Sequence, residues 1–262
     1  MRGMGKTGTI YLVGAGPGDA DLLTLRAARL IERAEIIVHD GLVDPSILAL
    51  ARPDAELVSV AKRRSKHTLP QDRINELLVR EAKAGRDVVR LKGGDPLIFG
   101  RGGEEAEAAL AAGIAVEIVP GISAANGAAA ASGIALTHRD AASIVSFVAG
   151  QCKGLSEQDW SGLAGKGRTL VIYMGVKTAP QIAEKLMADG LAPDVPVAII
   201  ENAARPEMRV LRSILAGLPE MVSREGVRSP ALIVIGEVAA RPHDPLDGGD
   251  LALARIAKEA AR

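Results

Sequence analysis

The chain has 262 residues, of which 48% are hydrophobic and 24% charged, as in a globular protein with one large or two modest domains. Its formal net charge is zero and only 2% of its residues are aromatic, so it has neither the basic field nor the stacking platform of a nucleic-acid binder. Because Cys152 is its only cysteine, the sequence excludes an internal disulfide and a cysteine-based metal site.

The remaining composition gives no sign of metal binding or export. The histidines, at positions 39, 67, 138 and 243, lack the spacing of metal ligands. The positively charged start leads into a short apolar run that glycine, proline and aspartate interrupt, unlike a signal peptide, and no apolar stretch is long enough to span a bilayer. We therefore expect a cytoplasmic protein that binds no metal, nucleic acid or membrane.

The first predicted strand, residues 9–13, runs into the sequence G-A-G-P-G-D at 14–19. This loop superficially resembles the dinucleotide fingerprint G-x-G-x-x-G, but Asp19 occupies the position of the third glycine. Pro17 has no amide hydrogen to donate, and Asp19 would repel a phosphate. The loop therefore favours an uncharged or cationic nucleoside over a nicotinamide cofactor.

Strand and helix patterns alternate through the rest of the first half. Amphipathic helices are predicted at 22–34 and 70–84, the second with Pro70 in its first turn and Gly85 as its stop. Strands are predicted at 35–39, 56–60, 87–91 and 116–119. This alternation is typical of a mostly parallel α/β unit.

The most informative stretch, residues 89–105, reads V-R-L-K-G-G-D-P-L-I-F-G-R-G-G-E-E. It joins a strand to a helix that begins near Glu104, so it lies at the carboxyl end of a strand, where open α/β sheets bind ligands. Any one of its five glycines could be a simple turn residue. Because they stand together with Asp95, Arg101 and Glu104, we predict a binding site at Gly93, Gly94, Gly100, Gly102 and Gly103.

An alanine-rich segment, residues 124–133, follows and is expected to pack closely against another element. Beyond it, a helix at 178–189 and strands at 143–149, 169–174, 195–200 and 231–235 predict a second α/β unit. We predict an N-terminal domain at 8–122, a C-terminal domain at 123–240 and a tail at 241–262, to which we assign no function.

A series of blocks, taken in order, resembles the uroporphyrinogen-III C-methyltransferase family of class III, or tetrapyrrole, methyltransferases. The resemblance extends from Thr9 to about Ala239 and is far more specific than either glycine loop alone. The matching blocks are V-G-A-G-P-G-D at 13–19, L-L-T-L-R-A at 22–27, V-H-D-x-L-V at 38–43, R-L-K-G-G-D-P at 90–96, F-G-R-G-G-E-E at 99–105, V-P-G-I-S-A at 119–124, G-I-A-L-T-H-R at 133–139 and Y-M-G at 173–175.

This resemblance implies two α/β domains with the active-site cleft between them, a tetrapyrrole methylase fold that is not Rossmann-like, and usually a homodimer. It implies S-adenosylmethionine as the methyl donor, with S-adenosylhomocysteine as a product. The positions that contact the donor in the family correspond to Pro17, Gly93, Gly94, Asp95, Ile98, Ser123, Ala124, Met174, Ala203 and Ala231.

The resemblance also implies an acid/base pair, Asp40 and Lys62, each near the end of a predicted strand. The implied reaction methylates uroporphyrinogen III at ring carbons 2 and 7, giving precorrin-2 for sirohaem or cobalamin synthesis. Asp40 would draw the proton from a pyrrole N–H and so make the ring carbon nucleophilic. The alternatives are that Asp40 caps a helix and that Lys62 is a solvated lysine.

The carboxylates of such a substrate require local cations, because the net charge of the chain is zero. The candidates are Arg101, His138, Arg139 and Arg63. The alternative is interdomain salt bridging, particularly to Glu104 and Glu105.

Departures from the commonest family pattern are few: Leu97 replaces phenylalanine, Ala61 replaces glycine, and Asn202-Ala203-Ala204 replaces Asn-Gly-Thr. Other interpretations are an enzyme that methylates a later precorrin, a nucleotide-binding regulatory module and a nicotinamide oxidoreductase. Because the chain begins almost directly at the family blocks, we expect no fused dehydrogenase and ferrochelatase module, and an enzyme that stops at precorrin-2.

Overall fold

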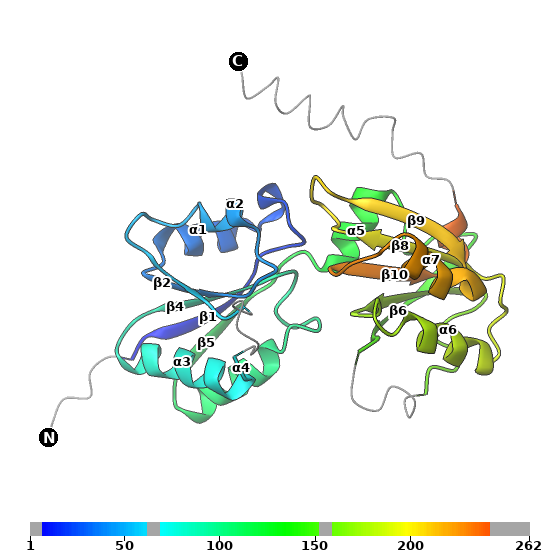
Figure 1. Cartoon of the computed structure of the whole chain (residues 1–262). Coiled ribbons are helices and arrows are strands. Elements are labelled where there is room, and N and C mark those ends of the chain that lie inside the picture. The colour runs from blue at the N-terminus through cyan, green and yellow to red at the C-terminus, as the bar shows by residue number, and fades with distance from the viewer. Residues whose placement is uncertain (1–6, 62–68, 152–158, 242–262) are drawn as a thin grey trace, which may run out of the picture. The chain divides into compact units, whose positions relative to one another are not determined.

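The computed structural model describes residues 7–61, 69–151 and 159–241, and the chain divides into two compact units between Ala124 and Ala125 (Figure 1). The boundary predicted from the sequence lies at residues 122–123. Lys62, Arg63, Cys152 and all of the predicted tail except its first residue lie outside the described ranges.

The first unit is built on a five-stranded sheet in the order β3-β2-β4-β1-β5, in which every neighbouring pair is parallel. This confirms the predicted parallel unit. The central strand β4 is buried along its whole length. The strands are β1 (Thr9–Gly14), β2 (Ile36–His39), β3 (Glu56–Ser59), β4 (Val88–Lys92) and β5 (Ala115–Val119).

Helices cover both faces of this sheet (Figure 1). On one face, α1 (Leu25–Arg33) and α2 (Pro45–Leu48) pack through Ile31 and Ile47 against Val89. On the other, α3 (Gln71–Lys83) and α4 (Gly102–Ala111) pack through Leu78 and Ala109 against Val88. Successive residues of β4 therefore face opposite helix layers, as the alternation of a strand requires.

Helix α1 begins at Leu25, three residues later than the apolar pattern predicts. The hydroxyl of Thr24 accepts the Ala27 amide at 3.2 Å and caps the helix. The preceding residues form a 3₁₀ turn, η1 (Ala20–Leu22), which Asp19 caps by accepting the Asp21 amide at 2.9 Å. Capping side chains satisfy free N–H groups, so they set the start of the helix more closely than its apolar stripe does.

The connections of the first sheet diverge at the neighbouring strands β1 and β4. From β1 the chain crosses the α1 face, past β4, to β2. From β4 it crosses the α4 face in the opposite direction, past β1, to β5. Such a reversal is a topological switch point, where open α/β sheets bind ligands outside the carboxyl ends of the strands. The loops that leave these two strands are the two glycine-rich segments.

The second unit contains a mixed sheet in the order β6-β7-β10-β8-β9. Strands β6 and β7 are parallel, whereas β10 is antiparallel to both β7 and β8, and β8 is antiparallel to β9. The sequence predicted all of these strands except β9. Their bounds are β6 (Ala142–Ala149), β7 (Gly167–Tyr173), β8 (Pro196–Glu201), β9 (Arg209–Ile214) and β10 (Ala231–Ile235).

One face of the second sheet is covered by α6 (Ala179–Ala188) and α7 (Leu218–Arg224), which share a core with β7, β8 and β10. The short 3₁₀ helices are η3 (Leu215–Gly217) and η4 (Glu237–Ala240). The alanine-rich segment forms α5 (Ala124–Ser132), which buries only small residues. Its first turn is tied to β7, because the Ala125 amide donates to the Tyr173 hydroxyl at 3.0 Å.

Within the described ranges, no helix is both long and apolar enough to cross a membrane. In the same ranges, no three histidine, cysteine, aspartate or glutamate side chains gather as metal ligands.

Candidate active site

The two glycine-rich loops meet backbone to backbone at the switch point. The Gly94 amide donates to the Gly16 carbonyl at 2.7 Å, and the Gly16 amide donates to the Gly94 carbonyl at 3.2 Å. Both residues have a φ of +71°, which favours glycine. A Cβ at Gly14 would lie 2.5 Å from the Gly121 nitrogen, so the loop after β5 also packs on this pair.

Asp95 holds the loops after β4 and β5 together. Its Oδ1 accepts the Leu97 amide at 2.9 Å, and its Oδ2 accepts the Gly121 amide at 3.1 Å. An ionised carboxylate has about four lone-pair positions, so each oxygen of Asp95 can accept a second hydrogen bond. Asp95 is thereby fixed by the protein and still able to accept from a ligand hydroxyl or ammonium group.

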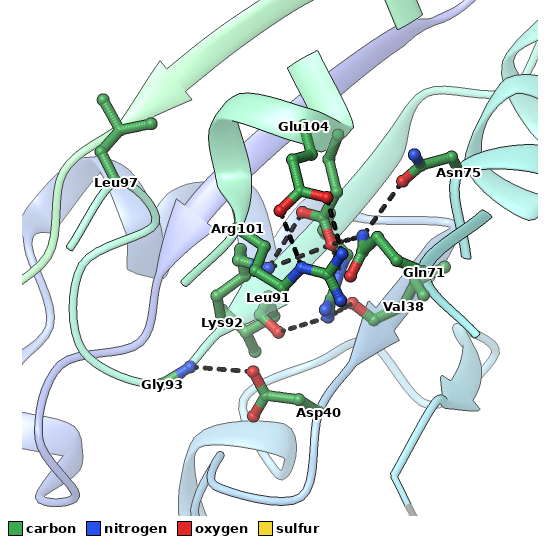
Figure 2. Close-up of polar contacts among 12 residues, drawn as sticks. Val38, Asp40, Gln71, Asn75, Leu91, Lys92, Gly93, Leu97, Arg101 and Glu104 are labelled. Atoms are coloured by element: carbon green, nitrogen blue, oxygen red, sulfur yellow. Dashed lines mark hydrogen bonds and ion pairs between the residues drawn. The ribbon is translucent and has the colours of Figure 1, made fainter. Parts of the chain in front are cut away.

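Asp40 follows β2, on the other side of β4 from the glycine pair. Its Oδ1 accepts the Leu42 amide at 2.9 Å, and its Oδ2 accepts the Gly93 amide at 3.3 Å (Figure 2). The N-cap of helix α2 is Asp44, whose Oδ1 accepts the Ser46 amide at 3.0 Å, so Asp40 does not cap this helix. Asp40 orients the turn that it begins and lies beside the first glycine of the β4 loop.

A buried ionic cluster that the sequence analysis did not predict lies beneath this loop (Figure 2). Both carboxylate oxygens of Glu105 lie 3.0 Å from the Lys92 ammonium, and Oε1 also accepts from Arg90 Nε at 3.0 Å. Gln71 donates to the same oxygen at 3.2 Å. We call Arg90, Lys92, Glu105 and Gln71 the Glu105 cluster.

The Glu105 cluster is closed to solvent, with side-chain exposures of 4% for Arg90, 3% for Lys92 and 0% for Glu105. Burial lowers the pKa of the Lys92 ammonium, and the neighbouring Arg90 lowers it further, whereas Glu105 and Asp40 act in the opposite direction. The sequence signal was present, because Arg90 and Lys92 are charges at alternate positions of an otherwise apolar strand and so share one face.

Arg101 pairs with Glu104 in a bidentate salt bridge, at 2.8 and 2.6 Å, on the surface of the first turn of α4. This hydrogen-bonded pairing raises the pKa of Arg101 and lowers the pKa of Glu104. Arg101 therefore pairs with Glu104 within the first unit and not across domains, and it does not pair with Glu105, which is buried with Arg90 and Lys92. Because the Arg101 side chain is 55% exposed, it remains accessible from solvent despite this pairing.

The structure gives different reasons for glycine at different positions of the β4 loop. A Cβ at Gly100 or Gly102 would lie 2.7 or 2.4 Å from the Pro96 carbonyl oxygen, so the fold of the loop itself requires these two glycines. At Gly103 a Cβ would meet nothing within 4 Å. The turn interpretation therefore explains Gly100 and Gly102, whereas Gly94 belongs to the contact with the first glycine loop.

The predicted donor-binding residues of the first unit all lie in loops or termini that follow its strands. Ile98, together with Leu97 and Phe99, forms an apolar tip of the β4 loop with exposures of 38–52%. Figure 2 shows Leu97 pointing away from the Glu105 cluster. The structure gathers at this edge Pro17 after β1, Gly93, Gly94, Asp95 and Ile98 after β4, and Ser123 and Ala124 after β5.

The remaining predicted donor-binding residues share one edge of the second sheet. Met174 follows β7 and Ala203 lies just beyond β8, while Ala231 begins the antiparallel strand β10 between them. The pairing of Ala231 with Glu201, the last residue of β8, fixes this arrangement.

Among the described non-glycine residues, five have a left-handed backbone: Phe99 and Arg101 in the β4 loop and three at this second edge. The φ angles are +55° at Met174, +51° at Asn202 and +56° at Ala204. Non-glycine residues adopt such angles rarely, and they cluster at functional sites. The left-handed conformation thus occurs at 202 and 204, whereas Ala203, which stands where the commonest family pattern has glycine, is outside the left-handed region.

His138 and Arg139 lie elsewhere. They precede β6, which is parallel to β7, so they are at the opposite edge of the sheet from Met174. His138 Nδ1 lies 3.1 Å from the Asp140 amide and Nε2 lies 3.2 Å from the Arg241 guanidinium, while Arg139 is exposed. The structure does not bring these two residues together with Met174, Ala203 and Ala231.

Comparison with known proteins shows the family of the chain. Residues 9–219 match the model of the tetrapyrrole (corrin/porphyrin) methylases. The chain belongs to the tetrapyrrole methylase family. A siroheme synthase of Gluconobacter oxydans is 51% identical over 240 residues, and one of Tolumonas auensis is 53% identical over 248 residues. These alignments cover 91% and 94% of the chain but 51% and 52% of the relatives, so the chain spans about half their length.

Solved structures of tetrapyrrole methylases are similar over the whole fold. The uroporphyrin-III C-methyltransferase of Thermus thermophilus, solved with S-adenosyl homocysteine, is 42% identical with a TM-score of 0.75. That alignment covers 88% of this chain and 98% of the Thermus chain. A cobalt precorrin-4 methyltransferase has a TM-score of 0.78 at 24% identity and 89% coverage of this chain and 96% of that one, a likeness of fold.

Proposed function

We propose that this tetrapyrrole methylase is a uroporphyrinogen-III C-methyltransferase, which transfers methyl groups from S-adenosylmethionine to ring carbons 2 and 7 to give precorrin-2. The observation that carries the proposal is the paired glycine loops with Asp40 beside them, in a chain 42% identical to the Thermus enzyme. The latter was solved with S-adenosyl homocysteine.

The residues at the first edge fit such a donor. Pro17 removes an amide and Asp19 adds a negative charge, which disfavours a phosphate and suits a cationic sulfonium nucleoside. The free lone pairs of Asp95 can accept from ribose hydroxyls or an ammonium group. When bound, the donor supplies an electrophilic methyl group.

Asp40 would act as the base of the reaction. Its oxygens each accept one backbone amide, which fixes the carboxylate and leaves a lone pair on each for a pyrrole N–H. Drawing that proton toward Asp40 pushes electron density onto the ring carbon, which then attacks the methyl group. Lys62 remains a prediction as the acid, and Arg101, His138 and Arg139 remain predictions for binding the substrate carboxylates.

The first experiment incubates the protein anaerobically with S-adenosylmethionine and uroporphyrinogen III and measures the tetrapyrrole by mass spectrometry. We expect a gain of two methyl groups. If the protein binds the donor and leaves this tetrapyrrole unmethylated, the substrate is a later precorrin. If it binds no donor, the proposal is wrong.

The role of Asp40 is tested by a matched pair of variants. Asp40→Asn is expected to lower kcat by about 10²-fold or more, the usual contribution of a general base, with unchanged affinity for S-adenosylhomocysteine. Asp44→Asn changes a nearby carboxylate that caps α2, and asparagine caps equally well, so its turnover should match the wild type. Normal turnover of Asp40→Asn would remove the assignment.

We further propose a homodimer in the cytoplasm whose product serves sirohaem or cobalamin synthesis. Equilibrium sedimentation tests the dimer. A single species at the monomer mass would contradict it.

A further inference from the structure

Lys92 is a buried charge that the proposed reaction does not yet use. It is the last residue of β4, and its ammonium contacts both oxygens of Glu105 at 3.0 Å. Two charge-assisted hydrogen bonds in a solvent-free interior restrain the lysine side chain. The Glu105 cluster therefore fixes the end of β4 through a side chain as well as through the sheet.

The main chain at Lys92 joins the loops of the active site. The Lys92 carbonyl accepts the Ala15 amide at 2.7 Å, and the next residue, Gly93, donates its amide to Asp40 Oδ2. A displacement of Lys92 would therefore move the hydrogen bond that orients Asp40 (Figure 2).

The charges of Lys92 and Asp40 also link these two residues. In the parallel register of β2 and β4, His39 is opposite Leu91, so Asp40 comes next to Lys92. The Asp40 carboxylate counteracts the lowering of the Lys92 pKa, which places the two groups within electrostatic range. Arg90 and Lys92 together face one buried carboxylate, Glu105, and the Asp40 carboxylate completes the balance of charge.

We propose that Lys92 is a positioning residue for the methyl transfer: anchored by Glu105, it holds the Gly93 amide and its own charge against Asp40, so that this carboxylate keeps one orientation toward the substrate. The proposal rests on the function proposed above for Asp40.

The variant Lys92→Met tests it. Methionine fills the space of the lysine stem, and Glu105 Oε1 keeps its hydrogen bonds from Arg90 and Gln71. Oε2 loses the hydrogen bond from Lys92, so the variant is expected to fold with reduced stability. We expect kcat to fall by about 10- to 100-fold, the scale of a small misplacement of a catalytic group. The KM for S-adenosylmethionine and the Kd of S-adenosylhomocysteine should change by less than about threefold, because Lys92 does not touch the donor in this proposal.

A double-mutant cycle separates positioning from a general structural role. If Lys92 acts through Asp40, then Lys92→Met should cost no further turnover, within about twofold, when added to Asp40→Asn. Lys185→Met is the control, because it removes one ammonium of the second unit that pairs with Asp189 at 3.2 Å, and its kcat should equal that of the wild type.

Each other outcome overturns the proposal. Wild-type turnover of Lys92→Met, additive losses in the cycle, or lost donor binding in Lys92→Met would each show that Lys92 does not act through Asp40. If Lys92→Met unfolds at the assay temperature, Lys92→Gln, which removes the charge and keeps an N–H donor facing Glu105, carries the same expectations. A wild-type protein that methylates no tetrapyrrole would instead refute the proposed function, which the same assay reports separately.

Discussion

Gly16 and Gly94 exchange a pair of backbone hydrogen bonds, at 2.7 and 3.2 Å, across the switch point of the first sheet. Two loops that are far apart in the sequence thereby become one short antiparallel bridge. Both glycines have left-handed backbone, so the bridge depends on residues without a Cβ.

Gly94→Ala is expected to weaken donor binding. Alanine at a φ of +71° costs about 1 kcal/mol, and its Cβ would stand 3.5 Å from the Ala124 nitrogen at the edge where the donor is proposed to bind. Titration calorimetry should show a Kd for S-adenosylhomocysteine raised about tenfold or more.

Gly113→Ala is the control for this substitution. Its φ is +74° and its Cβ would meet nothing within 4 Å, so it carries the same backbone cost away from the site. Equal losses of donor affinity in the two variants would mean that backbone strain alone, and not the position of Gly94, weakens binding.

Arg101→Gln is expected to raise the KM for the tetrapyrrole about tenfold, because a charge-assisted hydrogen bond to a substrate carboxylate is lost. Stability should change by less than about 0.5 kcal/mol, since the pair with Glu104 is exposed. Arg73→Gln breaks a comparable exposed pair with Glu76 on α3 and serves as the control in steady-state kinetics. An unchanged KM for Arg101→Gln would leave Arg101 with only its salt bridge.

Ala204→Gly is expected to stabilise the protein by roughly 0.5–1 kcal/mol, because glycine adopts the φ of +56° without steric cost. Ala203→Gly, one residue earlier and outside the left-handed region, should be neutral or destabilising. Urea denaturation measures the free energy of unfolding of both variants. A loss of stability in Ala204→Gly would contradict the strain assigned to this turn.

Stability at alkaline pH should report the burial of Lys92. Its pKa in the folded protein is lowered from the ordinary 10.5, so between these two values the unfolded chain binds a proton that the folded chain has lost. The free energy of unfolding attributable to Lys92 therefore rises with pH through this window and is lowest below it.

Urea denaturation between pH 7 and about pH 10 tests this dependence on pH. The free energy of unfolding of the wild type should rise relative to that of Lys92→Met as the pH rises. Lys92→Arg, whose side chain stays charged, should lack the rise as well. A difference that is independent of pH would be incompatible with a lowered pKa.

The regular elements were predictable where one local signal dominates. The apolar run before Gly93 predicts β4, and the stripe of Ile74, Leu78 and Ala82 predicts α3. Helix α5 gave no such signal, because alanine has no bulk with which to mark a buried face. Strand β9 was missed because its burial is only partial and arginines interrupt its apolar residues.

The candidate site was predictable as far as its loops. Glycines after strands indicate ligand loops, and Asp95 lies in the glycine-rich loop after β4, while Asp40 lies in the turn after β2. Partners within the site were not predictable, because they depend on strand order. Glu105 bonds Lys92, thirteen residues away, rather than the nearby Arg101, since β4 and α4 pack face to face.

The position of β10 has a consequence for how the second unit is made. This strand is the last along the part of the chain that the structure describes, yet it lies between β7 and β8, which do not pair with each other. As the chain leaves the ribosome, the first sheet has all its strands once residue 119 has emerged. The second sheet is complete only after residues 231–235 have been synthesised. A chain truncated before them would have the complete first sheet, followed by the pairs β6-β7 and β8-β9, each with an unpaired strand edge.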